Sequence, residues 1–219
     1  MKHRLTIPLL AGYLFLLCTA FQCGEGVEPD YQYVFQESLG LQPEHKSYRV
    51  GDTIWVQYRN PTNLLVDRRT NQPVQVDRVA LPLQLSLVPR YNVRLTSVGD
   101  YCDFVTDQGL NIGRVQSSLN TTFYQELGCS GPPGYDLTVG VVLRQPGTFS
   151  LEVPNSVDVR ACLNRATAFP LSSLEFSFAI TDGNQDVLAA IPPAQRAAIP
   201  FERLEELLAS KKLFMVKVE

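Results

Sequence analysis

Histidine is the scarcest of the residues that enzymes use for acid–base chemistry. The 219 residues include two histidines, His3 and His45. His3 lies in an N-terminal segment that we expect to be removed, and His45 lies in a polar stretch typical of a solvated loop. The sequence also lacks the Gly-x-Ser-x-Gly elbow of many hydrolases and a glycine-rich phosphate loop before a helix. We therefore expect no catalytic residues and no enzymatic activity.

Basic residues are few and scattered. The chain has 19 Lys and Arg against 22 Asp and Glu, and its formal net charge is −3. Its longest basic runs are the pairs Arg68-Arg69 and Lys211-Lys212. A nucleic-acid-binding protein needs a basic face that neutralises phosphates. We expect no nucleic-acid partner.

Cysteine is also sparse, and no Cys-x-x-Cys pair occurs among the five. Without such a pair the usual spacing of a zinc site is missing, so we expect no metal and no other cofactor. Four cysteines would remain after loss of an N-terminal leader, and an even number in an oxidising compartment predicts up to two disulfides. The spacing leaves their connectivity open. The candidates are Cys23, Cys102, Cys129 and Cys162.

A long hydrophobic run occurs at the N-terminus. Lys2 and Arg4 precede a largely apolar stretch at 5–17, which is followed by small residues at 18–20. This order is typical of a secretory signal peptide, here residues 1–20. A membrane-spanning helix would need about 20 predominantly apolar residues. The sequence predicts export to the periplasm, the outer membrane surface or the extracellular space.

The fate of Cys23 separates two exported forms. Cleavage after Ala20 leaves a soluble chain in which residues 21–30 form an acidic tether. In the alternative, Cys23 is the lipidated first residue of a bacterial lipoprotein, and one of the three other cysteines stays unpaired. Phe21 and Gln22 are bulkier than the residues that usually precede a lipidated cysteine. Lipid on Cys23 is the only membrane attachment that we expect.

Residues 31–219 carry the pattern of short strands. Apolar residues alternate with polar ones at 53–59, 81–95, 135–143, 149–153, 157–163 and 174–180. A period of two indicates strands with one buried face. About nine strands, separated by Pro, Gly, Asn and Asp, predict a single all-β domain, an antiparallel β-sandwich.

Two local features refine this expectation. Gln145-Pro146-Gly147 separates two alternating segments, which predicts a hairpin whose type II turn gives Gly147 a positive φ. Near the C-terminus, Phe201, Leu204 and Leu207 share one face of a segment that follows Pro200. This spacing predicts a short helix near 200–210, followed by a final strand at 214–218.

Trp55 and the acidic residues are the candidates for recognition or chemistry. Trp55 shares a strand face with Thr53, Gln57 and Arg59, so it either covers a second layer or is partly exposed. We favour burial, because tryptophan is highly buried on average. A paired-carboxylate hydrolase, such as a glycosidase, needs no histidine. Its acids would come from Asp100, Asp103, Asp107 and Glu126, although their spacing does not place two of them across a cleft.

Three stretches carry a resemblance: Tyr48–Trp55, the segment from Tyr135 to Leu151 with its Gln-Pro-Gly, and the leader ending in Phe-Gln-Cys. They resemble uncharacterised exported proteins and lipoproteins of Gram-negative bacteria. The resemblance implies an exported location and an Ig-like β fold, and it implies no activity.

Together these features favour an exported, non-enzymatic binding or accessory protein of the cell envelope or extracellular space. Its partner would be a protein or a glycan, which the sequence does not identify. The alternative is a secreted carboxylate-based hydrolase.

Overall fold

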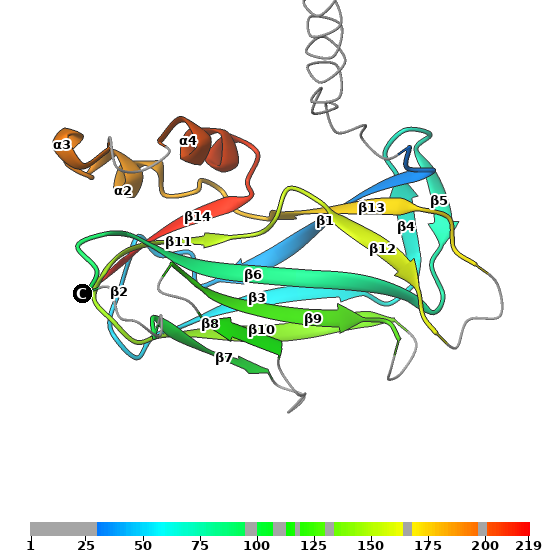
Figure 1. Ribbon diagram of the computed structural model, residues 1–219, viewed down its shortest axis with the longest axis horizontal. Helices are drawn as coiled ribbons and strands as arrows, with labels where there is room; N and C mark the ends of the chain where they lie inside the picture. Colours follow the sequence, from blue (N-terminus) through cyan, green and yellow to red (C-terminus); the bar gives the residue numbers. More distant parts are fainter. Residues whose placement is uncertain are drawn as a thin grey trace, which may run out of the picture. The chain divides into compact units, whose positions relative to one another are not determined.

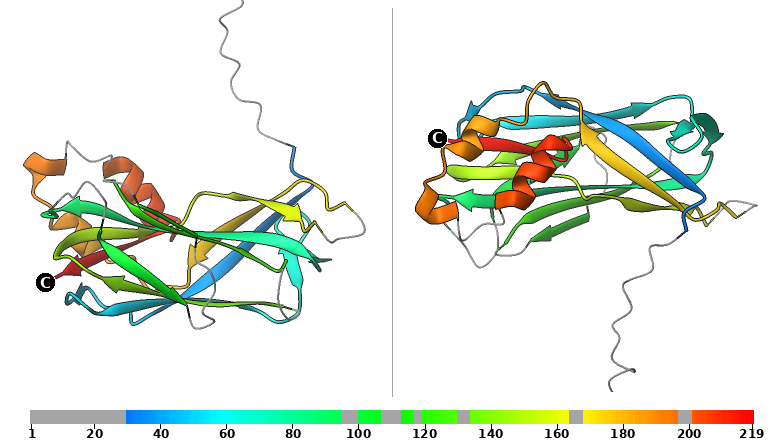
Figure 2. Two further views of the ribbon diagram at one scale, coloured as in Figure 1. Left: turned by 60° about the horizontal axis from the view of Figure 1, so that its bottom comes forward. Right: turned by 90° about the horizontal axis from the view of Figure 1, so that it is seen from above.

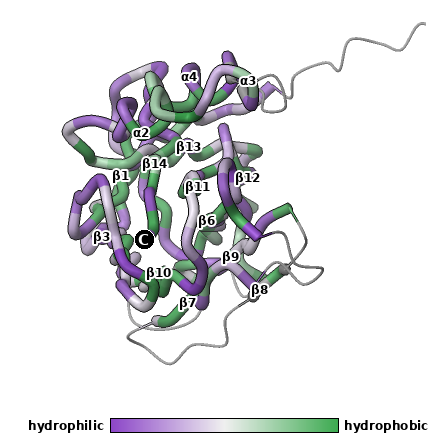
Figure 3. The backbone as a smooth tube through the Cα atoms, turned by 90° about the vertical axis from the view of Figure 1, so that its left-hand side faces the viewer, coloured by the Kyte–Doolittle hydropathy of each residue, from purple (hydrophilic) through white to green (hydrophobic). Residues whose placement is uncertain are grey.

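The period-two alternation of the sequence becomes strands with one buried face. In β3 (Thr53–Asn60), Ile54, Val56 and Tyr58 are buried, whereas Trp55 and Gln57 on the other face are exposed. Buried and exposed positions alternate in the same way along β9 (Thr121–Leu127) and β10 (Tyr135–Leu143). The backbone coloured by hydropathy shows this alternation along the strands (Figure 3).

The computed structural model describes residues 30–94, 100–106, 113–116, 119–129, 134–163, 168–196 and 201–219. The predicted signal peptide, Cys23 and all but the last residue of the predicted tether lie outside these residues. Tyr31–Glu219 forms one compact unit.

The described part of the chain contains fourteen strands (Figure 1). Besides β3, β9 and β10 they are β1 (Tyr33–Gln42), β2 (Ser47–Tyr48), β4 (Leu64–Asp67), β5 (Gln72–Gln75), β6 (Val79–Tyr91), β7 (Cys102–Thr106), β8 (Gly113–Gln116), β11 (Gly147–Glu152), β12 (Val157–Ala161), β13 (Ser172–Phe178) and β14 (Leu213–Val218).

The strands form two layers with a shared core. One layer runs from the end of β1 through β3 and β10 to β7, and the other runs through β8, β9, β6, β11, β14 and β2. β13 and β12 connect the first half of β1 to the start of β6. β1 and β13 lie side by side in Figure 2.

Aromatic rings from the two layers meet in the core. Phe104 of β7 and Phe123 of β9 have ring centroids 5.5 Å apart. Tyr58 of β3 contacts Phe176 of β13 edge-on at 5.4 Å. Such edge-to-face and tilted pairs are favourable arrangements of aromatic rings. The layers are therefore joined by a continuous hydrophobic interior.

The prediction of an all-β protein is confirmed, but two of its details are wrong. The strands number fourteen in the described part rather than about nine, and two pairs, β1 with β13 and β14 with β2, are parallel. Alternation identifies a strand and its buried face. It does not encode the direction of a partner that lies far away in the sequence, so the parallel pairs could not be expected.

The predicted hairpin around Gln145-Pro146-Gly147 is also wrong. β10 pairs with β3 and β7, whereas β11 pairs with β6 and β14. Residues 144–146 therefore carry the chain from one layer to the other. The positive φ predicted for Gly147 is present, at 138°.

Three short helices of the described chain lie near β14. They are α2 (Gln185–Ala189), α3 (Pro193–Arg196) and α4 (Phe201–Ala209), and they lie together beside β14 (Figures 1 and 3). Two of them, α2 and α4, pack against its outer face. The predicted C-terminal helix and final strand are confirmed as α4 and β14. Leu213 and Met215 face the helices, whereas Phe214, Val216 and Val218 face the main core. Burial on both faces explains why this strand is nearly continuously hydrophobic.

Candidate functional site

Trp55 lies on the outer face of the β3, β10 and β7 layer and is 37% exposed. The prediction that it is buried is wrong. It stands opposite Gln42 of β1 on one side and Gly140 of β10 on the other. Gly140 in turn stands opposite Val105 of β7, which is 38% exposed. Gln42, Trp55, Gly140 and Val105 thus form one row across the layer.

The missing side chain of Gly140 leaves room for the indole of Trp55. A Cβ atom at Gly140 would be 2.8 Å from Cζ3 of Trp55 and 2.7 Å from Cγ2 of Val105. Both distances are shorter than the contacts that a Cβ atom makes in proteins. The side chains of Trp55 and Val105 therefore pack over the backbone of Gly140. Gly40 stands opposite Gln57 in the next row. Both strands that flank β3 therefore carry a glycine on this face.

Polar side chains surround Trp55 on the same face. Thr53 and Gln57 flank it on β3, Thr138 stands opposite Gln57 on β10, and Gln42 adjoins it on β1. Their amide and hydroxyl groups both donate and accept hydrogen bonds without carrying charge. We call the outer face formed by Gln42, Thr53, Trp55, Gln57, Val105, Thr138 and Gly140 the Trp55 face.

Charged residues at the border of the Trp55 face occur in pairs of opposite sign. Nε of Arg59 lies 3.9 Å from Oδ2 of Asp136, and both side chains are exposed. Nε of Arg144 donates to Oδ2 of Asp103 at 2.6 Å. Each of these two described pairs brings one positive and one negative charge, so neither pair adds net charge to the face.

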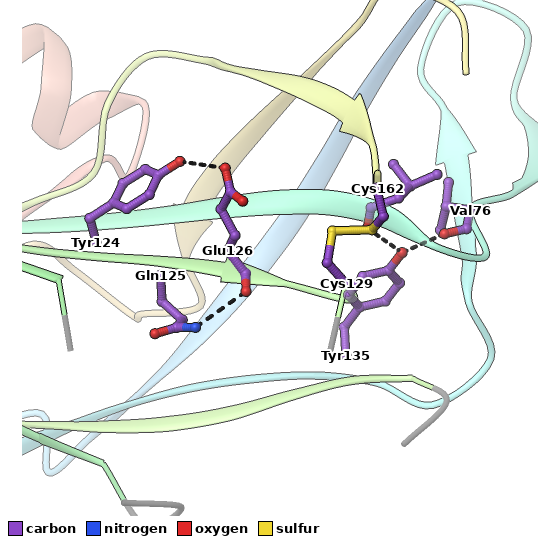
Figure 4. The surroundings of a disulfide bond; sticks show 8 residues. Val76, Tyr124, Gln125, Glu126, Cys129, Tyr135 and Cys162 are labelled. Atoms are coloured by element: carbon purple, nitrogen blue, oxygen red, sulfur yellow. Dashed lines mark hydrogen bonds between the residues drawn. A yellow bond between two sulfur atoms is a disulfide. The ribbon is translucent and has the colours of Figure 1, made fainter. Parts of the chain in front are cut away.

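The predicted disulfides are present in part. Cys129 and Cys162 are bridged, with an S–S distance of 2.05 Å. Their bridge links the segments that follow β9 and β12, the two strands that flank the start of β6 (Figure 4). Cys102 is buried in β7. A second bridge would join Cys102 to Cys23, and Cys23 lies outside the described residues, as does the predicted lipidation of that residue.

Two of the acids named for a hydrolase, Asp103 and Glu126, lie in different layers. Asp103 of β7 and Glu126 of β9 lie on the outer faces of opposite layers, and Phe104 and Phe123 of the same two strands meet in the core between them. Packed sheets are about 10 Å apart, so two outward-pointing carboxylates exceed the roughly 5 to 10 Å of a paired-acid mechanism. Asp100 is exposed, and Asp107 lies outside the described residues.

Glu126 borders a depression beside the disulfide. The depression has a volume of about 460 Å³, and its lining includes Ala80, Glu126 and Arg160. The hydroxyl of Tyr124 donates to Oε1 of Glu126 at 3.0 Å, and Figure 4 shows the two side chains on one face of β9. Partial burial and this hydrogen bond raise the pKa of Tyr124. The depression thus brings together one carboxylate and one guanidinium, whereas a paired-acid hydrolase uses two carboxyl groups.

His45 is exposed in the loop after β1, with its ring stacked on Tyr48. Among the described residues, no three His, Cys, Asp or Glu side chains converge as metal ligands. None of the described helices is long and apolar enough to cross a membrane.

Sequence reasoning missed Gly140 and Val105 as parts of a site. The available signal was the alternation in β3, which places Trp55 opposite Ile54, Val56 and Tyr58. Because those three residues form a complete buried face, the opposite face can be left to solvent.

No protein-family model matches the sequence, and a comparison with curated proteins finds no match.

Proposed function

We propose that the protein is an exported, non-enzymatic binding or accessory protein of the cell envelope or extracellular space, and that its partner contacts the Trp55 face. Export follows from the leader pattern of residues 1–20. The Ig-like character of the β-sandwich follows from the resemblance of the sequence to exported Gram-negative proteins.

The exposed position of Trp55 is the observation that carries the proposal. It is the only tryptophan of the chain. Tryptophan is strongly enriched among the residues that dominate binding energy at interfaces. Here it stands on a layer of paired strands, so its position is fixed before a partner arrives and little conformational entropy is lost on binding.

Co-sedimentation of the purified full-length protein with a Gram-negative envelope preparation tests this proposal. Wild-type protein should sediment with the envelope, and Trp55→Ala should reduce the bound fraction several-fold. Tyr124→Ala is the matched control, because Tyr124 is also an exposed aromatic residue, 41% exposed, on the other layer. Equal binding by wild type and Trp55→Ala would overturn the role of the face.

Two further measurements address export and the absence of catalysis. Intact mass of the protein recovered from a Gram-negative host should show loss of residues 1–20, and acylation at Cys23 would add a large mass that identifies the lipoprotein form. A retained leader would contradict export.

A glycoside substrate screen should show no hydrolysis. Hydrolysis that disappears in Glu126→Gln would favour the secreted hydrolase.

A further inference from the structure

We infer that the ligand of the Trp55 face is a neutral glycan, bound by stacking of a pyranose ring on the Trp55 indole. This inference rests on the proposed function and adds the chemical class of the partner. It is carried by the geometry of Trp55 over Gly140, by the neutral polar groups around it and by the balance of charge at its border.

The indole offers a surface of the shape that a sugar ring requires. One face of many pyranoses consists of C–H groups, which pack against the electron-rich face of an aromatic ring. An indole that protruded from the sheet would offer mainly its edge. Because Gly140 has no side chain, Cζ3 of Trp55 reaches over the neighbouring strand, so the indole leans across the layer toward β10. On the other side of β3, Gly40 of β1 also lacks a side chain, so no side chain stands out from the sheet at that position.

The groups around the indole match the hydroxyls of a sugar. Each hydroxyl is both a donor and an acceptor, so its best partners are groups that can do both. Gln42 and Gln57 supply amides, and Thr53 and Thr138 supply hydroxyls, from three strands of one layer. A ligand stacked on Trp55 thus meets polar groups on several sides.

The charged pairs at the Trp55 face argue against a charged polymer as its ligand. A polyanion or polycation is held mainly by unpaired charges of the opposite sign. At the Trp55 face, Arg59 stands with Asp136 and Arg144 with Asp103. An added charge of either sign would meet attraction and repulsion together. A neutral ligand experiences neither this attraction nor this repulsion, so we expect the Trp55 face to bind neutral glycans in preference to charged ones.

The apolar area is also small for a protein partner. Stable protein interfaces bury about 800 Å² on each side around a well-packed apolar core. The exposed large hydrophobic residues on this face are Trp55 and Val105 among those described. The other exposed ones include Leu64, Val66, Tyr124 and Leu171, which lie on other strands or loops. A single aromatic platform suits one or two sugar rings.

Fluorescence of the single tryptophan provides the test. Purified full-length protein is titrated with neutral oligomers of glucose, mannose, galactose and N-acetylglucosamine, and with polygalacturonate and chitosan as charged comparisons. At least one neutral oligomer should change the emission saturably. Calorimetry with Trp55→Ala should then show binding at least about tenfold weaker. Trp55→Phe should retain part of the affinity, and Tyr124→Ala should bind like the wild type.

Each outcome decides between the two proposals. Saturable binding of a neutral oligomer that needs Trp55 supports the inference. Binding only to a charged polymer overturns it, and so does the absence of any glycan response when envelope binding still depends on Trp55. In these last two cases the proposed binding function survives with another class of partner. If neither glycan nor envelope binding depends on Trp55, both proposals fail.

Discussion

The indole of Trp55 and the backbone of Gly140 are in direct cross-strand contact on an outer face of the β-structure. An alanine Cβ at position 140 would be 2.8 Å from Cζ3 of Trp55. The contact places Cζ3 of Trp55 over Gly140, and it leads to the first prediction.

Gly140→Ala should lift the indole away from the sheet. The added methyl group cannot coexist with Cζ3 of Trp55 and Cγ2 of Val105 at their present distances. Trp55 fluorescence should become more accessible to acrylamide, and affinity for the ligand of the Trp55 face should fall. Gly40→Ala is the control, since its Cβ would meet ordinary contacts at 3.7 Å. Identical quenching in Gly140→Ala and wild type would contradict the packing.

Gly128→Ala should be strongly destabilising. Gly128 has a φ of +88°, and its Cβ would be 2.1 Å from Cε1 of Tyr135. The Tyr135 hydroxyl is fixed 2.9 Å from the carbonyl oxygen of Val79, so the ring cannot move away freely. Backbone strain and overpacking together should lower the free energy of unfolding by about 3 kcal/mol.

Gly51→Ala separates these two causes. Gly51 has a φ of +96°, but a Cβ there would meet nothing within 4 Å. Its substitution should therefore cost only the backbone strain, about 1 to 2 kcal/mol. Urea denaturation of both variants gives the comparison. Equal losses at the two positions would show that Gly128 does not pack against Tyr135 as described.

Removal of the Cys129–Cys162 bridge should destabilise the fold by about 2 to 4 kcal/mol. The bridge closes a sequence separation of 33 residues, and the chain-entropy model gives roughly 4 kcal/mol for such a loop. The variant with both cysteines changed to alanine should unfold at lower urea than the wild type. Reduction of the wild type should produce a similar loss. A further loss when this variant is reduced would reveal the second predicted bridge.

Glu37→Gln should stabilise the protein at neutral pH. Burial raises the pKa of Glu37 above its ordinary value. The folded state therefore disfavours the charged carboxylate, and its stability falls as pH rises through the unfolded and then the folded pKa. Neutral glutamine removes this penalty. The melting temperature of Glu37→Gln should exceed that of the wild type at pH 7, and the gain should vanish once acid protonates Glu37 in both states.

Asp67→Asn is the comparison of opposite sign. The backbone N–H of Val34 and the hydroxyl of Thr70 donate to Asp67 and lower its pKa. Its contribution to stability is present at neutral pH and lost as pH falls through the folded pKa. Asp67→Asn should thus be less stable than the wild type at pH 7, by a margin that shrinks in acid. Matching pH profiles for the two variants would contradict both assignments.

Local patterns in the sequence predicted the elements that depend on near neighbours. The strands, α4 and β14 follow from the spacing of their own hydrophobic residues. The pairing of the strands and the surroundings of Trp55 depend on residues that are distant in the sequence. The Pro-Gly pair between β10 and β11 predicted a hairpin, but β10 pairs with β3 and β11 pairs with β14. In the same way, the alternation in β3 places Trp55 on the outer face, but it does not show that Gly140, far along the chain, stands opposite the indole.

The most direct test of the account is collisional quenching of the single tryptophan by acrylamide in the folded protein. Trp55 is 37% exposed on an outer face. We predict red-shifted emission typical of a hydrated indole and a quenching constant that is a substantial fraction of the value in the unfolded chain. Blue-shifted emission that resists acrylamide would place Trp55 in the core and would contradict the Trp55 face and the functions proposed for it.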